Sequence, residues 1–169
     1  MKTVFLGIGT NLGDREENLK KSLRIISETS GKITAVSSVY ETEPWGFESG
    51  NLFLNMVVQI KTKLTPKVLL KRIMMTEAVM GRIRAGKGYS SRLIDIDILF
   101  YDDLVTDLPE LRIPHPRIPD RRFILVPLCE LIPDFIHPIL KKTMAQMLAE
   151  CPDHKMVKLY KGWQTLEHS

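Results

Sequence analysis

The sequence has no hydrophobic run long enough to cross a membrane, and it has only two cysteines among its 169 residues. A membrane-spanning helix needs about 20 consecutive apolar residues. The first apolar run is too short for the core of a secretion signal and leads at once into turn residues. Cys129 and Cys151 lie far apart, without histidine or cysteine at metal-ligand spacing. We therefore expect no membrane association, no structural zinc site and a reducing, cytoplasmic location.

The chain also lacks low-complexity segments, linkers and internal repeats. Its 44% hydrophobic and 26% charged residues are typical of a globular protein, and 169 residues can bury a core without disulfides or metals. We therefore expect one domain, residues 1–169, that works as a monomer. The 24 basic residues exceed the 20 acidic ones only modestly, so we expect no nucleic-acid partner.

The predicted elements follow the order strand, helix, strand, strand, helix, strand. The first helix begins after Asp14, with Glu17 three residues later, and ends at Gly31. The second begins after Thr65 and ends at Gly81. This order predicts an α+β, ferredoxin-like fold, with two helices packed on one face of an antiparallel sheet. Apolar and β-branched residues place the strands at residues 3–9, 33–40, 52–60 and 93–100.

Two loops and several C-terminal additions complete this prediction. The loop at residues 42–50 is long and carries aromatic residues, which is typical of binding loops. Residues 82–92 are rich in Gly, Ser and basic residues without an apolar period, and predict a mobile basic loop. The additions are an extended loop at 113–116, helices at 121–131 and 141–149, and a strand at 157–160.

Asp95 and Asp97 alternate with isoleucines in the last strand of the predicted core. Side chains alternate between the two faces of a strand, so both carboxylates should project from the same face. At about 3.3 Å per residue they would stand roughly 6 to 7 Å apart and repel one another unless a cation lies beside them. Mg²⁺ usually takes one or two carboxylates together with substrate phosphates. The alternative is an exposed sheet face on which both aspartates pair with Arg or Lys.

Basic residues gather in two segments, one before and one after this pair. Metal ions together with guanidinium groups are how proteins hold a triphosphate and neutralise charge during phosphoryl transfer. The sequence therefore favours a Mg²⁺-dependent enzyme that transfers a phosphate-containing group from ATP to a small molecule. The two clusters are Arg82, Arg84, Lys87 and Arg92, and Arg117, Arg121 and Arg122.

Two other polar residues each have a structural and a functional interpretation. His115 has proline on both sides and stands close to three arginines, so it is either structural or merely exposed, or it contacts phosphate. Asn55 falls in the middle of an apolar strand, where a buried amide needs hydrogen-bond partners. It either belongs to a structural network or binds a polar heterocycle that stacks on Phe53 or Phe123.

Seven motifs extend over essentially the whole chain: Gly7-Ile8-Gly9-Thr10-Asn11-Leu12-Gly13, Tyr40-Glu41-Thr42-Glu43-Pro44, Phe53-Leu54-Asn55, Glu77, Gly81-Arg82-Ile83-Arg84, Arg92-Leu93-Ile94-Asp95-Ile96-Asp97-Ile98-Leu99 and Pro114-His115-Pro116-Arg117. In this order and at these spacings, the set resembles the 6-hydroxymethyl-7,8-dihydropterin pyrophosphokinases of folate biosynthesis. The resemblance implies a ferredoxin-like fold and transfer of the terminal diphosphate of ATP to the pterin hydroxymethyl group, with release of AMP.

The resemblance also implies a role for each matching residue on the nucleotide side. Two Mg²⁺ ions would be held by Asp95 and Asp97. The catalytic residues would be these two aspartates with Arg82 and Arg92. Contacts to ATP would come from Glu77, Arg84, Arg92, Ile98, His115 and Arg121.

On the pterin side, the resemblance implies a ring sandwiched between aromatic side chains. Phe123 would lie on one side, and Tyr89 would close over the other. The amide of Asn55 and the backbone near Thr42 and Trp45 would hydrogen-bond the pterin. Phe53 and Asp95 would line the same pocket.

Two other classes of protein share part of this pattern. A Mg²⁺-dependent nucleotidyltransferase also uses a strand Asp-x-Asp pair, but it needs a Gly-Ser helix start shortly upstream, where this chain has its basic segment. A non-catalytic ferredoxin-like RNA-binding module suits the basic charge. Neither central strand, however, shows the ladder of exposed aromatics that such a module needs.

Overall fold

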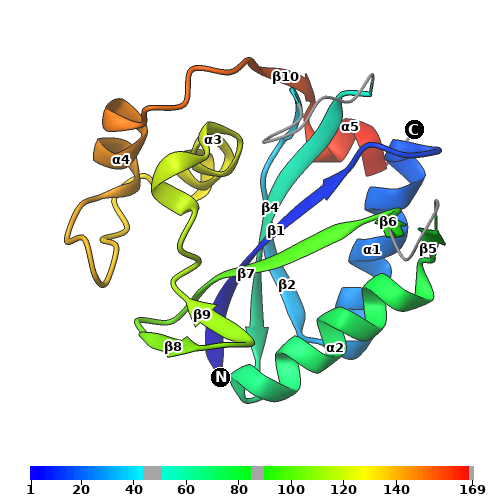
Figure 1. The fold of residues 1–169 in the computed structure, drawn as a ribbon, viewed down its shortest axis with the longest axis horizontal. Coiled ribbons are helices and arrows are strands. Elements are labelled where there is room, and N and C mark those ends of the chain that lie inside the picture. Colours follow the sequence, from blue (N-terminus) through cyan, green and yellow to red (C-terminus); the bar gives the residue numbers. More distant parts are fainter. Residues whose placement is uncertain (44–50, 85–89, 168–169) are drawn as a thin grey trace.

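The structure, a computed structural model, describes residues 1–43, 51–84 and 90–167 of the chain (Figure 1). In this part of the chain the central element is a six-stranded sheet in the order β10-β3-β4-β1-β7, with β2 also beside β4. Every neighbouring pair of strands is antiparallel. The strands are β1 (Lys2–Thr10), β2 (Lys32–Val36), β3 (Val39–Thr42), β4 (Phe53–Thr62), β7 (Asp95–Tyr101) and β10 (Val157–Lys161).

The helices that connect these strands make the fold ferredoxin-like. Helix α1 (Arg15–Thr29) joins β1 to β2, and α2 (Pro66–Val79) follows β4 on the way to β7. The sheet therefore has the strand order and crossovers that the predicted βαββαβ core requires. Figure 1 shows both helices on the same side of the sheet. The α+β prediction is confirmed.

Both predicted helix starts are capped by the expected side chains. The Asp14 carboxylate accepts a hydrogen bond from the main-chain N–H of Glu17, and the Thr65 hydroxyl accepts one from Val68. Gly81 follows α2 with a φ of 99°, a left-handed conformation that glycine adopts without steric cost. These local signals explain why both helices begin and end close to their predicted limits.

The strand predicted at residues 33–40 is two strands, because Ser37 interrupts it. The Ser37 hydroxyl accepts a hydrogen bond from Val57 N–H at 2.9 Å and donates one to the Ser38 carbonyl at 2.8 Å. A side-chain oxygen thus takes the place of a main-chain acceptor in the ladder. β2 and β3 then continue separately along the same edge of β4.

The prediction that residues 82–92 form one loop is wrong, because both ends of this segment are short strands. Strands β5 (Arg82–Arg84) and β6 (Ser90–Arg92) pair with each other, in a register that sets Arg82 opposite Arg92. Two three-residue strands are too short to produce a hydrophobic period, so no periodic pattern marks them. A second small hairpin, β8 (Thr106–Leu108) with β9 (Leu111–Ile113), also escaped prediction.

Two hydrophobic cores lie on opposite faces of the sheet. On one face α1 and α2 pack through buried residues such as Leu19 and Ile73. On the other, α3 (Arg122–Leu131) and α4 (Met144–Glu150) pack through Leu125 and Met144 against Leu99 of β7. Each large side chain buried in this way contributes roughly 1.5 to 3 kcal/mol. The C-terminal additions thus cover part of the sheet face that the two core helices leave open (Figure 1).

The remaining elements are a 3₁₀ turn (Ile118–Asp120) before α3 and a last helix, α5 (Trp163–Glu167). The predicted helices at 121–131 and 141–149 correspond to α3 and α4, and the predicted strand at 157–160 to β10. Across the described residues, the structure contains no helix that is both long and apolar enough to cross a membrane.

Candidate active site

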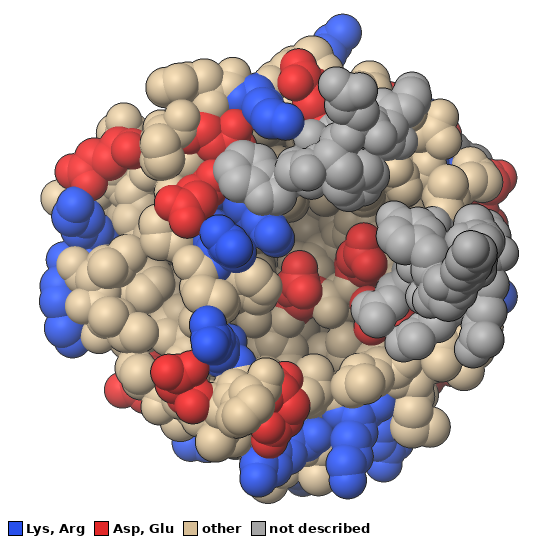
Figure 2. All heavy atoms as spheres, viewed as in Figure 1, with Lys and Arg blue, Asp and Glu red and all other residues tan. Residues whose placement is uncertain are grey.

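A pocket of about 470 Å³ opens on the α3 side of the sheet, beyond the part that α3 and α4 cover. Its floor is formed by β1, β4 and β7, and α2 contributes residues at one end. Figure 2 shows this face hollowed, with acidic side chains inside the hollow and basic side chains beside it. The floor residues are Gly7, Gly9, Asn55, Asp95 and Asp97.

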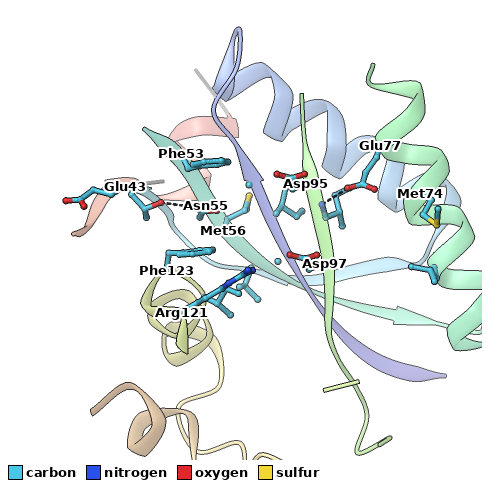
Figure 3. Close-up of a pocket in the computed structure, with 18 residues that line it drawn as sticks. Glu43, Phe53, Asn55, Met56, Met74, Glu77, Asp95, Asp97, Arg121 and Phe123 are labelled. Atoms are coloured by element: carbon cyan, nitrogen blue, oxygen red, sulfur yellow. Dashed lines mark hydrogen bonds between the residues drawn. The ribbon is translucent and has the colours of Figure 1, made fainter. Parts of the chain in front are cut away.

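Asp95 and Asp97 both line the pocket, as their alternation predicted (Figure 3). In the sheet Asp95 lies opposite Gly9, and Asp97 lies opposite Gly7. The glycines add no side chains to the floor, so the space in front of both carboxylates stays open. The residue that follows the pair, Ile98, is 5% exposed and packs in the core on the α1 and α2 face.

Glu77 of α2 is 4% exposed and reaches the same strand from its free edge. Its Oε2 accepts a hydrogen bond from the main-chain N–H of Ile96 at 3.1 Å. Among the described residues β7 is the last strand of the sheet, so its outer N–H groups have no strand partner there. Glu77 accepts the hydrogen bond from the outer N–H that lies between the two aspartates. This contact fixes the strand at the point where both carboxylates project.

Arg121 forms the basic side of the pocket, and His115 lies next to it, close to Asp97. His115 Nε2 lies 3.9 Å from Asp97 Oδ1, and its Nδ1 accepts a hydrogen bond from Arg117 N–H at 3.1 Å. A neutral ring that accepts at Nδ1 carries its proton on Nε2, the nitrogen nearer Asp97. Burial lowers the pKa of His115; Asp97 opposes this shift, while Arg121 and Arg117 reinforce it.

Arg121 stands at the start of α3 and is half-buried beside the pocket. Burial lowers the pKa of its guanidinium, and the nearby Asp97 carboxylate acts in the opposite direction. The guanidinium of arginine is so strongly basic that Arg121 keeps its positive charge whichever of these two effects is larger. Figure 3 shows its side chain extending toward Asp97, so a fixed positive charge faces the carboxylates across the pocket.

The end of the pocket away from α2 is aromatic and contains an oriented amide. The rings of Phe53 and Phe123 lie on opposite sides of it, with Asn55 between them in the view of Figure 3. Asn55 donates a hydrogen bond from Nδ2 to the Thr42 hydroxyl. The guanidinium carbon of Arg121 lies 5.7 Å from the centre of the Phe123 ring. A flat, polar heterocycle fits such a site.

Most of the predicted site residues whose side chains are described come together in this pocket. His115 is next to it, whereas Ile98 is in the core and does not line it. The main chain of Arg82, Arg84 and Arg92 runs through β5 and β6, but their side chains, and all of Trp45 and Tyr89, lie outside the described residues. The pocket brings together Thr42, Phe53, Asn55, Glu77, Asp95, Asp97, Arg121 and Phe123.

Sequence reasoning missed some pocket residues on α2. Leu70 and Met74 line the pocket together with Glu77. These three positions are separated by four and three residues, so they share one helix face. That second stripe, beside the core stripe of Leu69 and Ile73, was the signal that could have identified them.

The acidic residues of the pocket suit a magnesium ion better than a metal held by protein alone. The described residues contain no group of three or more His, Cys, Asp or Glu that could form a complete metal site. Asp95 and Asp97 supply two hard carboxylate ligands, and Mg²⁺ commonly takes its other ligands from water and substrate phosphate. The donor set therefore fits Mg²⁺ that arrives with a nucleotide.

Known proteins provide an independent comparison. Residues 5–133 match the model of the family 7,8-dihydro-6-hydroxymethylpterin-pyrophosphokinase. A 2-amino-4-hydroxy-6-hydroxymethyldihydropteridine pyrophosphokinase from Aquifex aeolicus is 41% identical over 150 residues, 89% of this chain and 92% of that protein. One with the same name from Porphyromonas gingivalis is 40% identical over 82% of this chain and 95% of that protein.

Longer proteins contain a region similar to this chain. The folic acid synthesis protein fol1 of Schizosaccharomyces pombe is 35% identical over 96% of this chain, which spans 22% of that protein. A crystal structure of Plasmodium falciparum HPPK-DHPS superposes with a TM-score of 0.70 at 20% identity, over 89% of this chain and 43% of that one, and supports the fold. With the family match over residues 5–133 and these relatives, the chain belongs to the 7,8-dihydro-6-hydroxymethylpterin-pyrophosphokinase family.

Proposed function

We propose that this chain transfers the diphosphate group of ATP to the hydroxymethyl group of 6-hydroxymethyl-7,8-dihydropterin, giving AMP and the pterin diphosphate in folate biosynthesis. Membership of the family supports the reaction. The observation that supports this pocket as the site of the reaction is that it combines an aromatic end, two carboxylates on its floor and a basic side. The aromatic end suits the pterin, the carboxylates and the neighbouring basic side suit the phosphates, and the α2 end remains for the nucleoside.

The pterin would occupy the aromatic end of the pocket. A flat ring between Phe53 and Phe123 would bury both faces, and offset stacking of this kind contributes about 0.5 to 1.5 kcal/mol beyond the area buried. Asn55, already oriented by Thr42, would hydrogen-bond the polar edge of the ring. Trp45 and Tyr89 would close over this end, as the family resemblance implies.

The triphosphate would lie over Asp95 and Asp97, which would hold two Mg²⁺ ions against it. When bound, Mg²⁺ neutralises phosphate charge and orients the phosphorus that is attacked. Glu77 would keep the two carboxylates in place through its hydrogen bond to Ile96 N–H. Leu70 and Met74 give the α2 end an apolar surface that suits the adenosine part.

Transfer needs the pterin hydroxymethyl oxygen to attack the β-phosphorus. A new oxygen–phosphorus bond forms, the bond between the β-phosphorus and the α,β-bridging oxygen breaks, AMP leaves with that oxygen, and the proton of the hydroxymethyl group is released to solvent. Arg121 would place a permanent positive charge beside the charge that develops on these oxygens. His115 would donate from Nε2 to a phosphate, and Arg82, Arg84 and Arg92 would contact ATP as the resemblance implies. Ile98, whose side chain lies in the core, would contact ATP only through its main chain.

We further propose that residues 1–169 act as one domain, as a monomer in the cytoplasm. The C-terminal strand β10 returns to pair with β3, which ties the additions to the core sheet. Cys129 and Cys151 are both free thiols, which suits a reducing compartment. Both substrates are small molecules.

The test is ³¹P NMR of the purified protein with Mg-ATP and 6-hydroxymethyl-7,8-dihydropterin. We expect AMP and a diphosphorylated pterin to appear together in equal amounts, without free pyrophosphate. Formation of ADP would mean single phosphoryl transfer, and free pyrophosphate would favour the nucleotidyltransferase. Unchanged ATP would favour the RNA-binding module; any of these three results would overturn the proposal.

A further inference from the structure

Helix α3 carries three pocket residues at its start, Arg121, Phe123 and Ile124, but cannot cap itself. Arg121 is its N-cap residue and makes no capping hydrogen bond, and the first turn has no acidic residue. Pro127, inside the helix, has no N–H to donate to the carbonyl of Phe123. The turn that presents Arg121 and Phe123 to the pocket therefore lacks hydrogen bonds that an ordinary helix start would have.

Asp153 supplies the missing cap from a distant part of the chain. Its Oδ2 accepts a hydrogen bond from the main-chain N–H of Arg122, the first residue of α3, at 3.0 Å. Its Oδ1 accepts one from Lys155 N–H, also at 3.0 Å, which orients the carboxylate. Asp153 is only 8% exposed, so solvent screens this contact little.

The charge of Asp153 has a specific use at this position. A helix start is the positive end of the helix dipole, and here it also carries the side chains of Arg121 and Arg122. A carboxylate at this end offsets both effects. Without the Asp153 carboxylate, the positive charges at the helix start would repel one another and the N–H of Arg122 would lose its acceptor. Both effects would favour a different path for the first turn of α3.

The segment that contains Asp153 then continues to the opposite side of the pocket. Four residues further on, β10 begins at Val157, which lies opposite Thr42 of β3. Thr42 is the residue that orients Asn55. One short segment, residues 153–157, thus connects the start of α3 with the end of β3. The family match ends at residue 133, so this segment lies beyond it.

We infer that Asp153 is a positioning residue for the reaction, because it caps α3 and thereby holds Phe123 against the pterin and Arg121 against the phosphates. This inference rests on the proposed function. Asp153 does not line the pocket, so its effect on the reaction is exerted through the helix start.

The experiment compares Asp153→Ala, Asp153→Asn and a matched control, Glu150→Ala. Glu150 also belongs to the C-terminal additions, but it is exposed and pairs only with Lys142 in the contacts the structure records. Rates are measured for each variant with pterin and ATP varied separately, at a temperature at which circular dichroism finds every variant folded. Asparagine keeps an oxygen that can accept from Arg122 N–H but does not carry the negative charge.

We expect Asp153→Ala to lower kcat/KM for the pterin by about tenfold or more, since small displacements of positioning groups cost that much. Asp153→Asn should recover part of this loss, because it keeps the acceptor for Arg122 N–H but not the negative charge, and Glu150→Ala should match the wild type. A purely structural role would lower the unfolding temperature of Asp153→Ala without changing the kinetics of the folded protein. That result, or an Asp153→Asn variant no better than Asp153→Ala, would overturn the inference.

The wild-type reaction separates this inference from the proposed function. A wild-type protein that makes no AMP from ATP and pterin contradicts the proposed function itself. A wild-type protein that makes AMP, beside an Asp153→Ala variant with the kinetics of Glu150→Ala, contradicts the positioning role alone.

Discussion

Glu77 Oε2 accepts a hydrogen bond from the main-chain N–H of Ile96 at 3.1 Å, at the one residue that separates Asp95 from Asp97. A buried side chain of α2 thereby holds the free edge of β7 where the two carboxylates project. The spacing of the acidic pair is therefore set by a helix on the opposite face of the sheet as well as by the strand itself.

Replacing Glu77 should separate its anchoring role from its charge. Glu77→Ala leaves the Ile96 N–H without its acceptor and should reduce the free energy of unfolding by about 1 to 3 kcal/mol. The same variant should lower kcat by about a hundredfold, because the aspartates lose their fixed position. Urea denaturation and steady-state AMP formation measure the two effects.

Glu77→Gln is the matched control, since its amide oxygen can still accept from Ile96. It should recover most of the lost stability. A Glu77→Ala variant as stable and as active as the wild type would show that the hydrogen bond is unimportant.

The amide of Asn55 occupies the space in which a side chain at position 9 would lie. A Cβ at Gly9 would come within 2.5 Å of Asn55 Oδ1, which is closer than real atoms approach. Gly9→Ala should therefore displace the amide and raise KM for the pterin about tenfold, with a smaller change in KM for ATP. Asn55→Ala should give the same pattern.

Gly7→Ala is the comparison for this prediction. Its Cβ would meet Leu99 at 3.5 Å, an ordinary van der Waals contact, so its effect on pterin KM should be smaller. If Gly9→Ala and Asn55→Ala instead raise KM for ATP more than KM for the pterin, the two ends of the pocket are assigned the wrong way round.

His137 should make the stability of the fold depend on pH. It is 4% exposed, and its Nδ1 accepts hydrogen bonds from the N–H groups of Ile139 and Leu140, both at 3.1 Å. Burial lowers the pKa of His137 below its ordinary value of 6.5. The unfolded chain therefore binds a proton that the folded protein does not, so this contribution to stability is present above about pH 6.5 and is lost as the pH falls below it.

His137→Asn tests this directly, because the asparagine oxygen can accept the same two hydrogen bonds without titrating. Between pH 7.5 and 5, the wild type should lose up to about 1.4 kcal/mol of unfolding free energy per pH unit more than the variant. Urea titrations at several pH values give the two slopes. Equal slopes would mean that His137 titrates alike in the folded and unfolded states.

The sequence predicted those parts of the site that depend on neighbouring residues. Alternation alone brings Asp95 and Asp97 to one face, and the capping residues Asp14 and Thr65 mark where both core helices begin. These features arise from backbone geometry within a few residues, so a single sequence contains them.

Contacts between distant segments could not be predicted in this way. The cap of α3 comes from Asp153, 31 residues beyond Arg122, and the break after β2 depends on a bond between Ser37 and Val57. Such partners are decided by which segments pack together in three dimensions, and no local pattern encodes them.

The most direct test of the account is the rate of AMP formation by Asp97→Ala with Mg-ATP and 6-hydroxymethyl-7,8-dihydropterin, beside Asp134→Ala as an exposed aspartate outside the pocket. The Asp97 side chain is 45% exposed, so its removal should leave the unfolding temperature nearly unchanged. We predict a loss of at least about a thousandfold, because several kcal/mol of metal-dependent charge stabilisation disappears. A folded Asp97→Ala protein that keeps most of the activity of Asp134→Ala would contradict the assignment of this pocket as the site of diphosphate transfer.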